Sequence, residues 1–535
     1  MNIAWWLERA ADEYGTRVAL VDGRSGTSWT YRELRDHAEA VGSALREDCG
    51  VQPDDVVVTL MPDDCWHTAI FYGVLRIGAV FSGFNRTLHL EKFATDIERL
   101  GARTLVVGSG YVEVGRRLLA DTALERLVVC DETAEPDLPD LRALAARPRP
   151  PAPVVPRTED QAAAVNFTGG TAGVSKGVVF PHGRLSLSAQ GSLFLDRLRS
   201  SDVNLSCISL YHSGGLHDAV KWVMAGAANV LTGGWDAGLS ARLIAEHRPT
   251  WIYFWVPTMV RDLMRHPAWT DLPLQGLRTI LCGEPVPPDL QAELIELGIV
   301  AQNSYGMTET MPVGILKPLV AHGEAPPVGS CGRPVPELCE VVLKDPATGE
   351  RVREPGVVGE VCVRGGVVSP GYHNDPERTA AAFDDEGFLH TRDVASFDQA
   401  GWWWLGGRTD DIINSGGEKL SLIEVESVVL THDAVLDVAC VAVAHERFGE
   451  VPAAVVALEP SVGLDEAKVV AVLDEHCMQH MERWKRPRLY VLREAVPRTM
   501  PKRTKDLRAL RDLVRDVVLT DADGVTSMSG LPARH

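Results

Sequence analysis

Strand-like and helix-like segments alternate along the first 150 residues, and this alternation is the strongest constraint on the fold. The strand-like segment RVALVDG is followed by WTYRELRDHAEAVGSALRE, whose apolar residues recur at helical spacing behind an N-cap residue, Thr30. The same alternation returns in four later segments: DVVVTLM, WHTAIFYGVLRIGAVF, LEKFATDIERLGARTLVVG and RRLLADTALERLVVC. Parallel strands need crossover helices, so the sequence predicts parallel sheets with helices packed on their faces.

The chain has 535 residues, which is too long for one hydrophobic core and predicts more than one domain. The α/β pattern continues to about residue 300, and short β segments separated by Gly, Pro and Asp follow from residue 329. We predict an α/β fold with a large N-terminal domain over 1–408, which includes a β-rich subdomain at about 329–408. A small, mobile C-terminal α/β domain is expected over 409–520, and a polar tail over 521–535.

The composition excludes several classes of partner. A formal net charge of −20 and a pI near 5.3 argue against nucleic acid or an anionic membrane as the main partner. No apolar run is long enough to span a membrane and the charged start is unlike a signal peptide, so we expect a cytoplasmic protein. The ten cysteines are scattered without a C-x-x-C pair, which predicts buried reduced thiols rather than a zinc site.

The stretch Asn166–Gly177 reads NFTGGTAGVSKG and lies between two strand-like segments. Glycine backbone can turn its N–H groups toward an anion, threonine hydroxyls add donors, and Lys176 adds a positive charge. The stretch therefore predicts a phosphate-binding loop, although it does not have the G-x-x-x-x-G-K-[ST] spacing of a Walker A motif. Taken alone, an ordinary hairpin turn explains it equally well.

Two further stretches carry polar residues suited to a nucleotide. Asn303–Thr310 reads NSYGMTET and places hydroxyls beside the carboxylate of Glu309, which could hold Mg²⁺ on phosphate oxygens. Asp393 could accept hydrogen bonds from ribose hydroxyls, and Arg408 could donate to hydroxyls or phosphate. The alternatives are a solvated loop glutamate and a surface ion pair.

Taken in order, these motifs resemble those of the adenylate-forming superfamily, which includes acyl-CoA synthetases, firefly luciferase and nonribosomal adenylation domains. NFTGGTAGVSKG is similar to the family's phosphate loop, and NSYGMTET to its adenine- and magnesium-contacting motif. The segments Gly359–Tyr372 and His390–Glu426 resemble its β-rich stretch and its hinge region. The resemblance runs from WTYREL to the end of the small domain.

The resemblance implies a role for each matching residue. ATP β- and γ-phosphates would be held by Thr168, Gly169, Gly170, Thr171, Gly173 and Lys176. Adenine, the α-phosphate and Mg²⁺ would be contacted by Gly283, Glu284, Pro285, Ser304, Tyr305, Gly306, Met307, Thr308 and Glu309, with Thr308 on the α-phosphate and Glu309 on the metal. Asp393 and Arg408 would bind the ribose, and Asp410 would be the hinge residue. The loop that faces the pantetheine of CoA would consist of Ser415, Gly416, Gly417 and Glu418.

The same resemblance places the acyl site near His212, which would control carboxylate access. His217 and Asp218 could add a polar contact there, but a pair on a surface loop is the favoured interpretation. Trp251, Phe254, Trp255, Val256 and Pro257 lie where the family lines its acyl pocket, although aromatic clusters more often form plain core.

The sequence departs from the family pattern in its phosphate loop and near its C-terminus. Gly169, Ala172 and Ser175 replace serine, threonine and proline, so backbone groups and Lys176 should hold the phosphates. The family's C-terminal motif carries a lysine that contacts the carboxylate and the α-phosphate, but ungapped counting puts Arg503 at that position. We assign this catalytic role to Lys502, with Lys505 as the second candidate.

We therefore predict an AMP-forming acid:CoA ligase that uses ATP and Mg²⁺, with Thr168 and Glu309 also in its catalytic centre. One alternative keeps adenylation but uses an amine or a carrier-protein thiol as the acceptor. Another is a nucleotide-binding protein with impaired catalysis. The acid is expected to be apolar or aromatic and of modest size, and the oligomeric state is left open.

Overall fold

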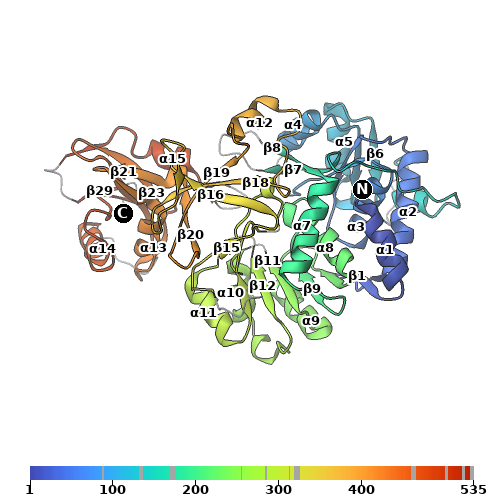
Figure 1. Ribbon diagram of the computed structural model, residues 1–535, viewed down its shortest axis with the longest axis horizontal. Coiled ribbons are helices and arrows are strands. Elements are labelled where there is room, and N and C mark those ends of the chain that lie inside the picture. The colour runs from blue at the N-terminus through green and yellow to red at the C-terminus, as the bar shows by residue number, and fades with distance from the viewer. Residues whose placement is uncertain are drawn as a thin grey trace, which may run out of the picture. The chain divides into compact units, whose positions relative to one another are not determined.

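The computed structural model describes residues 1–86, 90–131, 137–168, 175–254, 256–282, 286–312, 314–318, 326–459, 466–499, 504–520 and 525–529. The chain divides into two compact units. The larger unit comprises Met1–Val342, Cys362–His390 and Asp398–Trp404, and the smaller comprises Leu343–Val361, Thr391–Phe397 and Leu405–His535. The predicted α/β class is confirmed, with several sheets and their covering helices (Figure 1).

One sheet of the larger unit has the strand order β6-β5-β3-β4-β7-β8 and is parallel except for the β7–β8 hairpin. The strand β3 reads VVVTL and is buried at every residue, as expected for a parallel strand covered on both faces. The strands are β3 (Val56–Leu60), β4 (Val80–Gly83), β5 (Thr104–Val107), β6 (Arg126–Val129), β7 (Ala162–Thr168) and β8 (Lys176–Pro181). Its helices are α3 (Cys65–Arg76), α4 (Leu90–Leu100), α5 (Val112–Asp121) and α6 (Leu141–Ala145).

The other large sheet has the order β13-β12-β11-β9-β10-β1-β2 and is parallel except at β1–β2. Its order reverses at β9, which has β10 on one side and β11 on the other. Open α/β sheets bind ligands at the carboxyl ends of their strands at such a reversal. The strands are β1 (Val18–Asp22), β2 (Ser28–Thr30), β9 (Val203–Ser206), β10 (Ala228–Leu231), β11 (Trp251–Phe254), β12 (Thr279–Cys282) and β13 (Val300–Gln302). The helices that follow in sequence are α9 (Ala237–His247), α10 (Pro257–Arg265) and α11 (Pro288–Glu296).

Helices α1 (Ala4–Tyr14), α2 (Tyr31–Glu47) and α3 gather on one side of the larger unit (Figure 1). The predicted N-cap is confirmed, because the Thr30 side chain accepts from Glu33 N–H while the Glu33 carboxylate accepts from Thr30 N–H. Helices α2 and α3 approach closely at Gly42 and Gly73. A Cβ atom on Gly73 would lie 2.8 Å from the Ala38 carbonyl oxygen and 3.0 Å from the Gly42 nitrogen.

Helix α8 (Ser213–Ala225) is buried along its whole length and packs beside α7 (His182–Leu195). The prediction that His217 and Asp218 form a surface-loop pair is therefore wrong. His217 contacts Ser192 Oγ through Nε2 at 3.3 Å, and Asp218 forms an ion pair with Lys221 at 2.7 Å. The polar character of His217 and Asp218 suggested a loop. Their partners lie within the core, where buried charges are paired.

A β-rich segment follows the α/β part, as predicted. Its five-stranded sheet has the order β17-β16-β18-β19-β20, and the division between the units falls within several of its strands. The strands are β16 (Cys339–Lys344), β17 (Arg351–Val352), β18 (Gly359–Gly365), β19 (Leu389–Phe397) and β20 (Trp403–Arg408). The short elements nearby are β14 (Leu316–Lys317), β15 (Arg333–Pro334) and α12 (Pro376–Ala382).

The smaller unit is built on a sheet with the order β22-β21-β24-β23-β28, in which β25 also pairs with β24 and β29 pairs with β25. Each face of this sheet carries its own apolar cluster, one of which contains residues of α13 and α14 and the other residues of α15. The strands are β21 (Ile412–Ser415), β22 (Glu418–Ser421), β23 (Val435–His445), β24 (Gly449–Leu458), β25 (Leu489–Arg493), β28 (Val518–Leu519) and β29 (Thr526–Ser529). The helices are α13 (Leu422–Leu430), α14 (Glu466–His480) and α15 (Leu507–Asp512).

All ten cysteines are free and buried, as the sequence predicts. Each lies among packed side chains, and burial raises the pKa of thiols such as Cys207, to about 12. Among the described residues, no helix combines the length and the apolar character needed to cross a bilayer.

We predict that Gly73→Ala destabilises the larger unit by about 1–3 kcal/mol, because the added methyl group overpacks the crossing of α2 and α3. Thermal unfolding should show a lower midpoint for this variant. Gly110→Ala is the control, since no atom lies within 4 Å of a Cβ added there. Equal unfolding midpoints for the two variants would show that α2 and α3 can move apart without a loss of stability.

Candidate active site

The stretch Asn166–Gly177 forms the end of β7, a connection and the start of β8. Thr168 and Lys176 lie opposite each other in the antiparallel register, which brings the two ends of the predicted phosphate loop together. Four of the predicted loop residues lie outside the described residues: Gly169, Gly170, Thr171 and Gly173. The described part therefore fixes the base of the loop and the position of its lysine.

Lys176, Tyr372 and Glu309 bring three distant sequence motifs together. The Tyr372 hydroxyl donates to Glu309 Oε1 at 3.0 Å, and Lys176 Nζ lies 3.4 Å from the same hydroxyl oxygen. The Lys176 ammonium also lies 4.9 Å from the centroid of the Tyr372 ring, within cation–π range. The phosphate-loop lysine and the predicted metal-binding carboxylate are thus joined through one tyrosine.

Backbone hydrogen bonds fix this arrangement. Ser369 N–H donates to the Glu309 carbonyl at 2.7 Å, and His373 N–H donates to the Gly177 carbonyl at 2.7 Å. The Ser369 hydroxyl donates to the Val179 carbonyl at 2.8 Å. Sequence reasoning missed Tyr372 as a site residue because it treated GEVCVRGGVVSPGY only as a β-rich stretch. Its tyrosine after Pro-Gly was the available signal.

Ser175, which replaces the family's usual proline, is held by helix α4. Lys92 donates to the Ser175 hydroxyl, and Arg99 donates to the Ser175 carbonyl and, at 3.1 Å, to the Asp375 carboxylate. Asp96 lies beside this group. Burial raises the pKa of Asp96 to about 6, although Lys92 and Arg99 act in the opposite direction. Helix α4 therefore supplies a charged tether to the end of the phosphate loop.

The motif Asn303–Thr310 turns tightly before Glu309. Tyr305 N–H donates to the Leu316 carbonyl at 3.0 Å, and Ile315 N–H donates to the Tyr305 carbonyl at 2.8 Å. The predicted nucleotide-contacting residues Ser304, Tyr305, Gly306, Met307 and Thr308 lie in this one described turn, while Gly283, Glu284 and Pro285 lie outside the described residues.

Glu309 suits a divalent cation. It lies in the short 3₁₀ turn Thr308–Thr310, its exposed fraction is 7%, and its described hydrogen bond comes from the neutral hydroxyl of Tyr372. A buried carboxylate with so little charge compensation is costly, and a hard cation shared with phosphate oxygens would remove that cost.

His212 is the N-cap of α8, and its ring Nδ1 accepts from Gly214 N–H at 3.2 Å. The loop before it is clamped by residues that sequence reasoning did not single out. Leu210 N–H donates to Asp63 Oδ1 at 3.0 Å, and the same Asp63 oxygen lies 3.1 Å from His67 Nδ1. Asn166 Nδ2 donates to the Tyr211 carbonyl at 3.2 Å, so the loop is also tied to the phosphate-loop strand.

The Asp63–His67 pair is buried, and His67 Nε2 continues the chain to Thr59 Oγ1 at 2.9 Å. Burial alone would raise the pKa of Asp63, but hydrogen bonds from His67, Ser209 and Leu210 hold it below its usual value. Asp63 is therefore an ionised anchor that fixes the backbone just before His212. No periodic pattern marks the contact between Asp63 and Leu210, since Asp63 follows β3 and Leu210 follows β9 of the other large sheet.

A cavity of about 160 Å³ opens where the order of the second sheet reverses. Its lining comes from the ends of β9 and β10 and from neighbouring loops, and includes Arg86, Ser206, Tyr211, Trp235 and Met259. Of the predicted acyl-pocket residues, Trp255 lies outside the described residues, and Val256 and Pro257 begin α10. Trp251 packs on Trp222 and Phe254 on Trp235, which makes these two residues core.

The predicted ribose pair also comes together, within the smaller unit. Arg408 Nη1 donates to Asp393 Oδ1 at 3.0 Å. The turn before Asp393 is held by the Glu360 carboxylate, which accepts from Arg392 N–H at 2.8 Å. Arg392 has a φ of +61°, a conformation that favours glycine, so the Glu360 contact supports a strained backbone.

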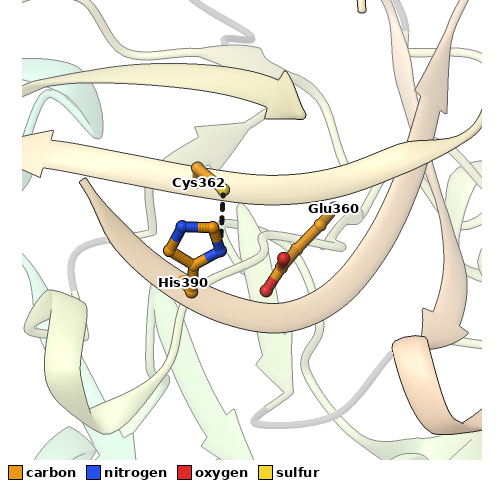
Figure 2. A group of neighbouring side chains, drawn as sticks. All are labelled: Glu360, Cys362 and His390. Atoms are coloured by element: carbon orange, nitrogen blue, oxygen red, sulfur yellow. Dashed lines mark hydrogen bonds between the residues drawn. The ribbon is translucent and has the colours of Figure 1, made fainter. Parts of the chain in front are cut away.

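Figure 2 shows three side chains from β18 and β19 whose ligand atoms lie within 4.8 Å of one another: Glu360, Cys362 and His390. They are the kinds of group that bind metal ions. Cys362 Sγ lies 3.6 Å from His390 Nδ1, and His390 Nε2 lies 3.5 Å from an Asp384 carboxylate oxygen. Glu360 already accepts a hydrogen bond from Arg392 N–H. The described contacts of Glu360, Cys362 and His390 therefore connect β18 with β19 and with the turn before Asp393.

The predicted hinge residue Asp410 lies in the 3₁₀ turn Thr409–Asp411. The predicted loop from Ser415 to Glu418 is a two-residue hairpin turn, in which Gly416 and Gly417 have φ values of +63° and +95°. Lys502 lies outside the described residues. Lys505 forms an ion pair with Glu426 at 2.7 Å and lies 3.5 Å from an Asp411 carboxylate oxygen.

Comparisons with known proteins show the family to which the chain belongs. A family profile described as AMP-binding enzyme matches residues 7–373, and one described as AMP-binding enzyme C-terminal domain matches residues 424–502. A feruloyl-CoA synthase from Amycolatopsis sp is 31% identical over 450 residues, which cover 84% of this chain and 87% of the relative.

Two solved structures share the fold and 25% sequence identity with this chain. An anthranilate CoA ligase in complex with anthranoyl-AMP has a TM-score of 0.83 and covers 96% of this chain and 97% of its own. An amide bond synthetase from Marinactinospora thermotolerans has a TM-score of 0.82 and covers 97% of this chain and 100% of its own.

We predict that Tyr372→Phe weakens ATP binding in the presence of Mg²⁺ by about tenfold, because Glu309 and Lys176 lose the hydroxyl that holds them. Isothermal titration calorimetry measures the change. Tyr111→Phe, in a 3₁₀ turn after β5, should bind as the wild type does. An unchanged affinity in Tyr372→Phe would show that the bridge does not organise the site.

The raised pKa of Asp96 predicts a pH-dependent stability. A carboxyl group with a folded-state pKa of about 6 binds its proton more tightly in the folded state than in the unfolded state. The folded protein therefore becomes less stable as the pH rises toward 6. The neutral variant Asp96→Asn lacks this loss. Its melting temperature relative to wild type should therefore increase from about pH 4 to about pH 7 and then level off. A difference that does not change with pH would contradict the assignment.

Proposed function

Because the chain belongs to the AMP-binding enzyme family, we propose that it activates a carboxylic acid with ATP and transfers the acyl group to CoA. The observation that carries this proposal is the convergence of Lys176 and Glu309 on Tyr372. This convergence places a phosphate-loop lysine and a buried carboxylate at one point, as a nucleotide with a divalent cation requires. The similarity to CoA ligases over more than four-fifths of the chain supports the acyl acceptor.

In the first half-reaction, a carboxylate oxygen of the acid attacks the α-phosphorus of ATP. The new oxygen–phosphorus bond forms as the bond to pyrophosphate breaks, which gives an acyl adenylate. Lys176 and the loop backbone stabilise the negative charge on the departing phosphates. Glu309 would hold Mg²⁺, which when bound neutralises phosphate charge. Asp393 and Arg408 would bind the ribose hydroxyls.

In the second half-reaction, the thiol sulfur of CoA attacks the carbonyl carbon of the adenylate and forms the thioester bond. The bond from that carbon to the phosphate oxygen breaks, AMP leaves with its electrons, and the thiol proton is released. The two-residue turn Gly416-Gly417 would present its backbone to the pantetheine arm, with Glu418 beside it. No side-chain nucleophile is needed, because the mixed anhydride is already activated.

We propose an aromatic monocarboxylic acid of modest size as the substrate. The names of the similar proteins refer to feruloyl-CoA and to anthranilate, both of which are aromatic acyl groups. The cavity at the sheet reversal is small and combines aromatic and polar lining residues. The Asp63 anchor would keep the His212 loop in place beside it.

An amine acceptor is the second candidate, since an amide bond synthetase shares the fold over nearly the whole chain. Both candidates predict pyrophosphate release with the correct acid. They differ in the product that forms when CoA or an amine is supplied, so product analysis distinguishes them.

The test is pyrophosphate release with a panel of benzoic, cinnamic, phenylacetic and medium-chain aliphatic acids, with and without CoA. We expect release with an aromatic acid and an acyl-CoA product, detected by mass spectrometry, only when CoA is present. Lys176→Met should lower kcat/KM for ATP by about 100-fold, because it removes positive charge from the departing phosphates. The exposed-pair variant Lys485→Met should behave as wild type. Absence of release with every acid would exclude both acceptors and favour a nucleotide-binding protein without catalysis.

A further inference from the structure

The last hairpin of the smaller unit has a well-defined stem. Strands β26 (Arg498–Thr499) and β27 (Thr504–Lys505) pair antiparallel, with Arg498 opposite Lys505. In the sequence, the two strands of the stem are separated by residues 500–503, which include Lys502 and lie outside the described residues. The stem is therefore the described part of this hairpin, and its contacts show how the hairpin is fastened.

The first strand of the stem is fastened by a bidentate ion pair. Arg498 Nε donates to Asp437 Oδ2 at 2.8 Å, and Arg498 Nη2 donates to Asp437 Oδ1 at 2.6 Å. Asp437 lies on β23, a long strand whose own residues contribute to both apolar clusters of the unit. Two parallel hydrogen bonds from one guanidinium fix orientation as well as distance.

The second strand is fastened by Lys505. Its ammonium lies 2.7 Å from Glu426 Oε1 on α13 and 3.5 Å from Asp411 Oδ1 in the predicted hinge turn. Glu426 Oε1 also accepts from Cys440 N–H on β23 at 2.5 Å, and Asp411 Oδ2 accepts from Arg408 N–H at 3.1 Å. One lysine thus connects the hairpin to α13, to β23 through Glu426, and to the hinge turn.

The charge balance makes Lys505 difficult to release. Its side chain is 17% exposed, and those of its two carboxylate partners, Glu426 and Asp411, are 11% and 9% exposed. Withdrawal of the ammonium would leave two buried carboxylates facing each other, which is strongly unfavourable. Burial raises the pKa of Glu426 and Lys505 opposes that rise, so the pair depends on the lysine staying in place.

We propose that Lys505 is a positioning residue that fastens the hairpin stem, and that it does not itself contact the reacting carboxylate and phosphate. Together with Arg498 it fastens both strands of the hairpin to which the resemblance to the family gives a role in adenylation. This inference rests on the proposed function, because it assigns Lys505 a role in the first half-reaction. It predicts that Lys505 acts through its ion pairs, chiefly the shorter one with Glu426.

The test compares Lys505→Met, Lys505→Arg and Glu426→Gln, with ATP–pyrophosphate exchange reporting adenylation. A second assay follows acyl-CoA formation from a synthetic acyl adenylate, which bypasses adenylation. We expect Lys505→Met and Glu426→Gln each to lower the exchange rate by about tenfold and to leave the second assay unchanged, because the proposed role of this hairpin is confined to adenylation. The double variant should be no slower than Lys505→Met, since the two residues act as one unit.

Glu424 provides a matched control, because it lies on the same helix α13 and forms an ion pair at 2.8 Å with Lys485 through a carboxylate that is 46% exposed, compared with 11% for Glu426. Glu424→Gln and Lys485→Met should leave both assays unchanged. Lys505→Arg should recover most of the exchange activity, because the guanidinium keeps the ion pair. Melting temperatures detect a variant that fails to fold. In that case the conservative variants Glu426→Gln and Lys505→Arg distinguish a positioning role of Lys505 from direct contact with the reacting groups.

Two results would overturn the proposal. If Lys505 contacts the reacting groups directly, Glu426→Gln leaves the lysine available and exchange stays at the wild-type rate, while Lys505→Met abolishes it. Equal losses in both assays would show a merely structural role. Absence of exchange in the wild type with every acid would instead exclude the proposed function, which separates the two failures.

Discussion

The site depends on one buried negative charge, the carboxylate of Glu309. Its backbone carbonyl accepts from Ser369 N–H and its side chain accepts from Tyr372, so it links its own turn to the segment Ser369–His373. That segment is bonded in turn to Gly177 and Val179 on β8. A carboxylate in such a place is stable only if cations approach it, and the lysine of the phosphate loop does so through the tyrosine hydroxyl.

The same dependence explains how an altered phosphate loop can be accommodated. A proline beside the loop would fix the backbone by its ring, whereas Ser175 leaves the backbone freer. Helix α4 supplies the missing restraint through Lys92 and Arg99, which bind the Ser175 hydroxyl and carbonyl. The restraint is electrostatic, and burial raises the pKa of Asp96 beside it to about 6. The substitution therefore exchanges a covalent restraint for an electrostatic one.

The sequence predicted the architecture because that information is local. Periodicity of apolar residues located the strands and helices of the large sheets, and the Thr30–Glu33 capping box is a contact between neighbours in sequence. The Asp393–Arg408 pair could be predicted from motif order. The role of Tyr372 and the bond from Leu210 to Asp63 could not, since their partners are distant in sequence and belong to other motifs and another sheet. Asp218 was misplaced because its burial depends on Lys221 and on strands that no local pattern reveals.

Within the smaller unit, the candidate functional groups form one connected set. Asp411 accepts from the backbone of Arg408, whose side chain binds Asp393, and it also lies beside the Lys505 ammonium. The ribose pair and the lysine hairpin are consequently joined through one carboxylate in the predicted hinge turn. A rotation about this turn that preserves these contacts carries the hairpin and Arg408 together. A rotation that breaks them leaves Glu426 to hold Lys505 alone, so the ion pair with Glu426 is the contact that keeps the hairpin stem fastened to α13.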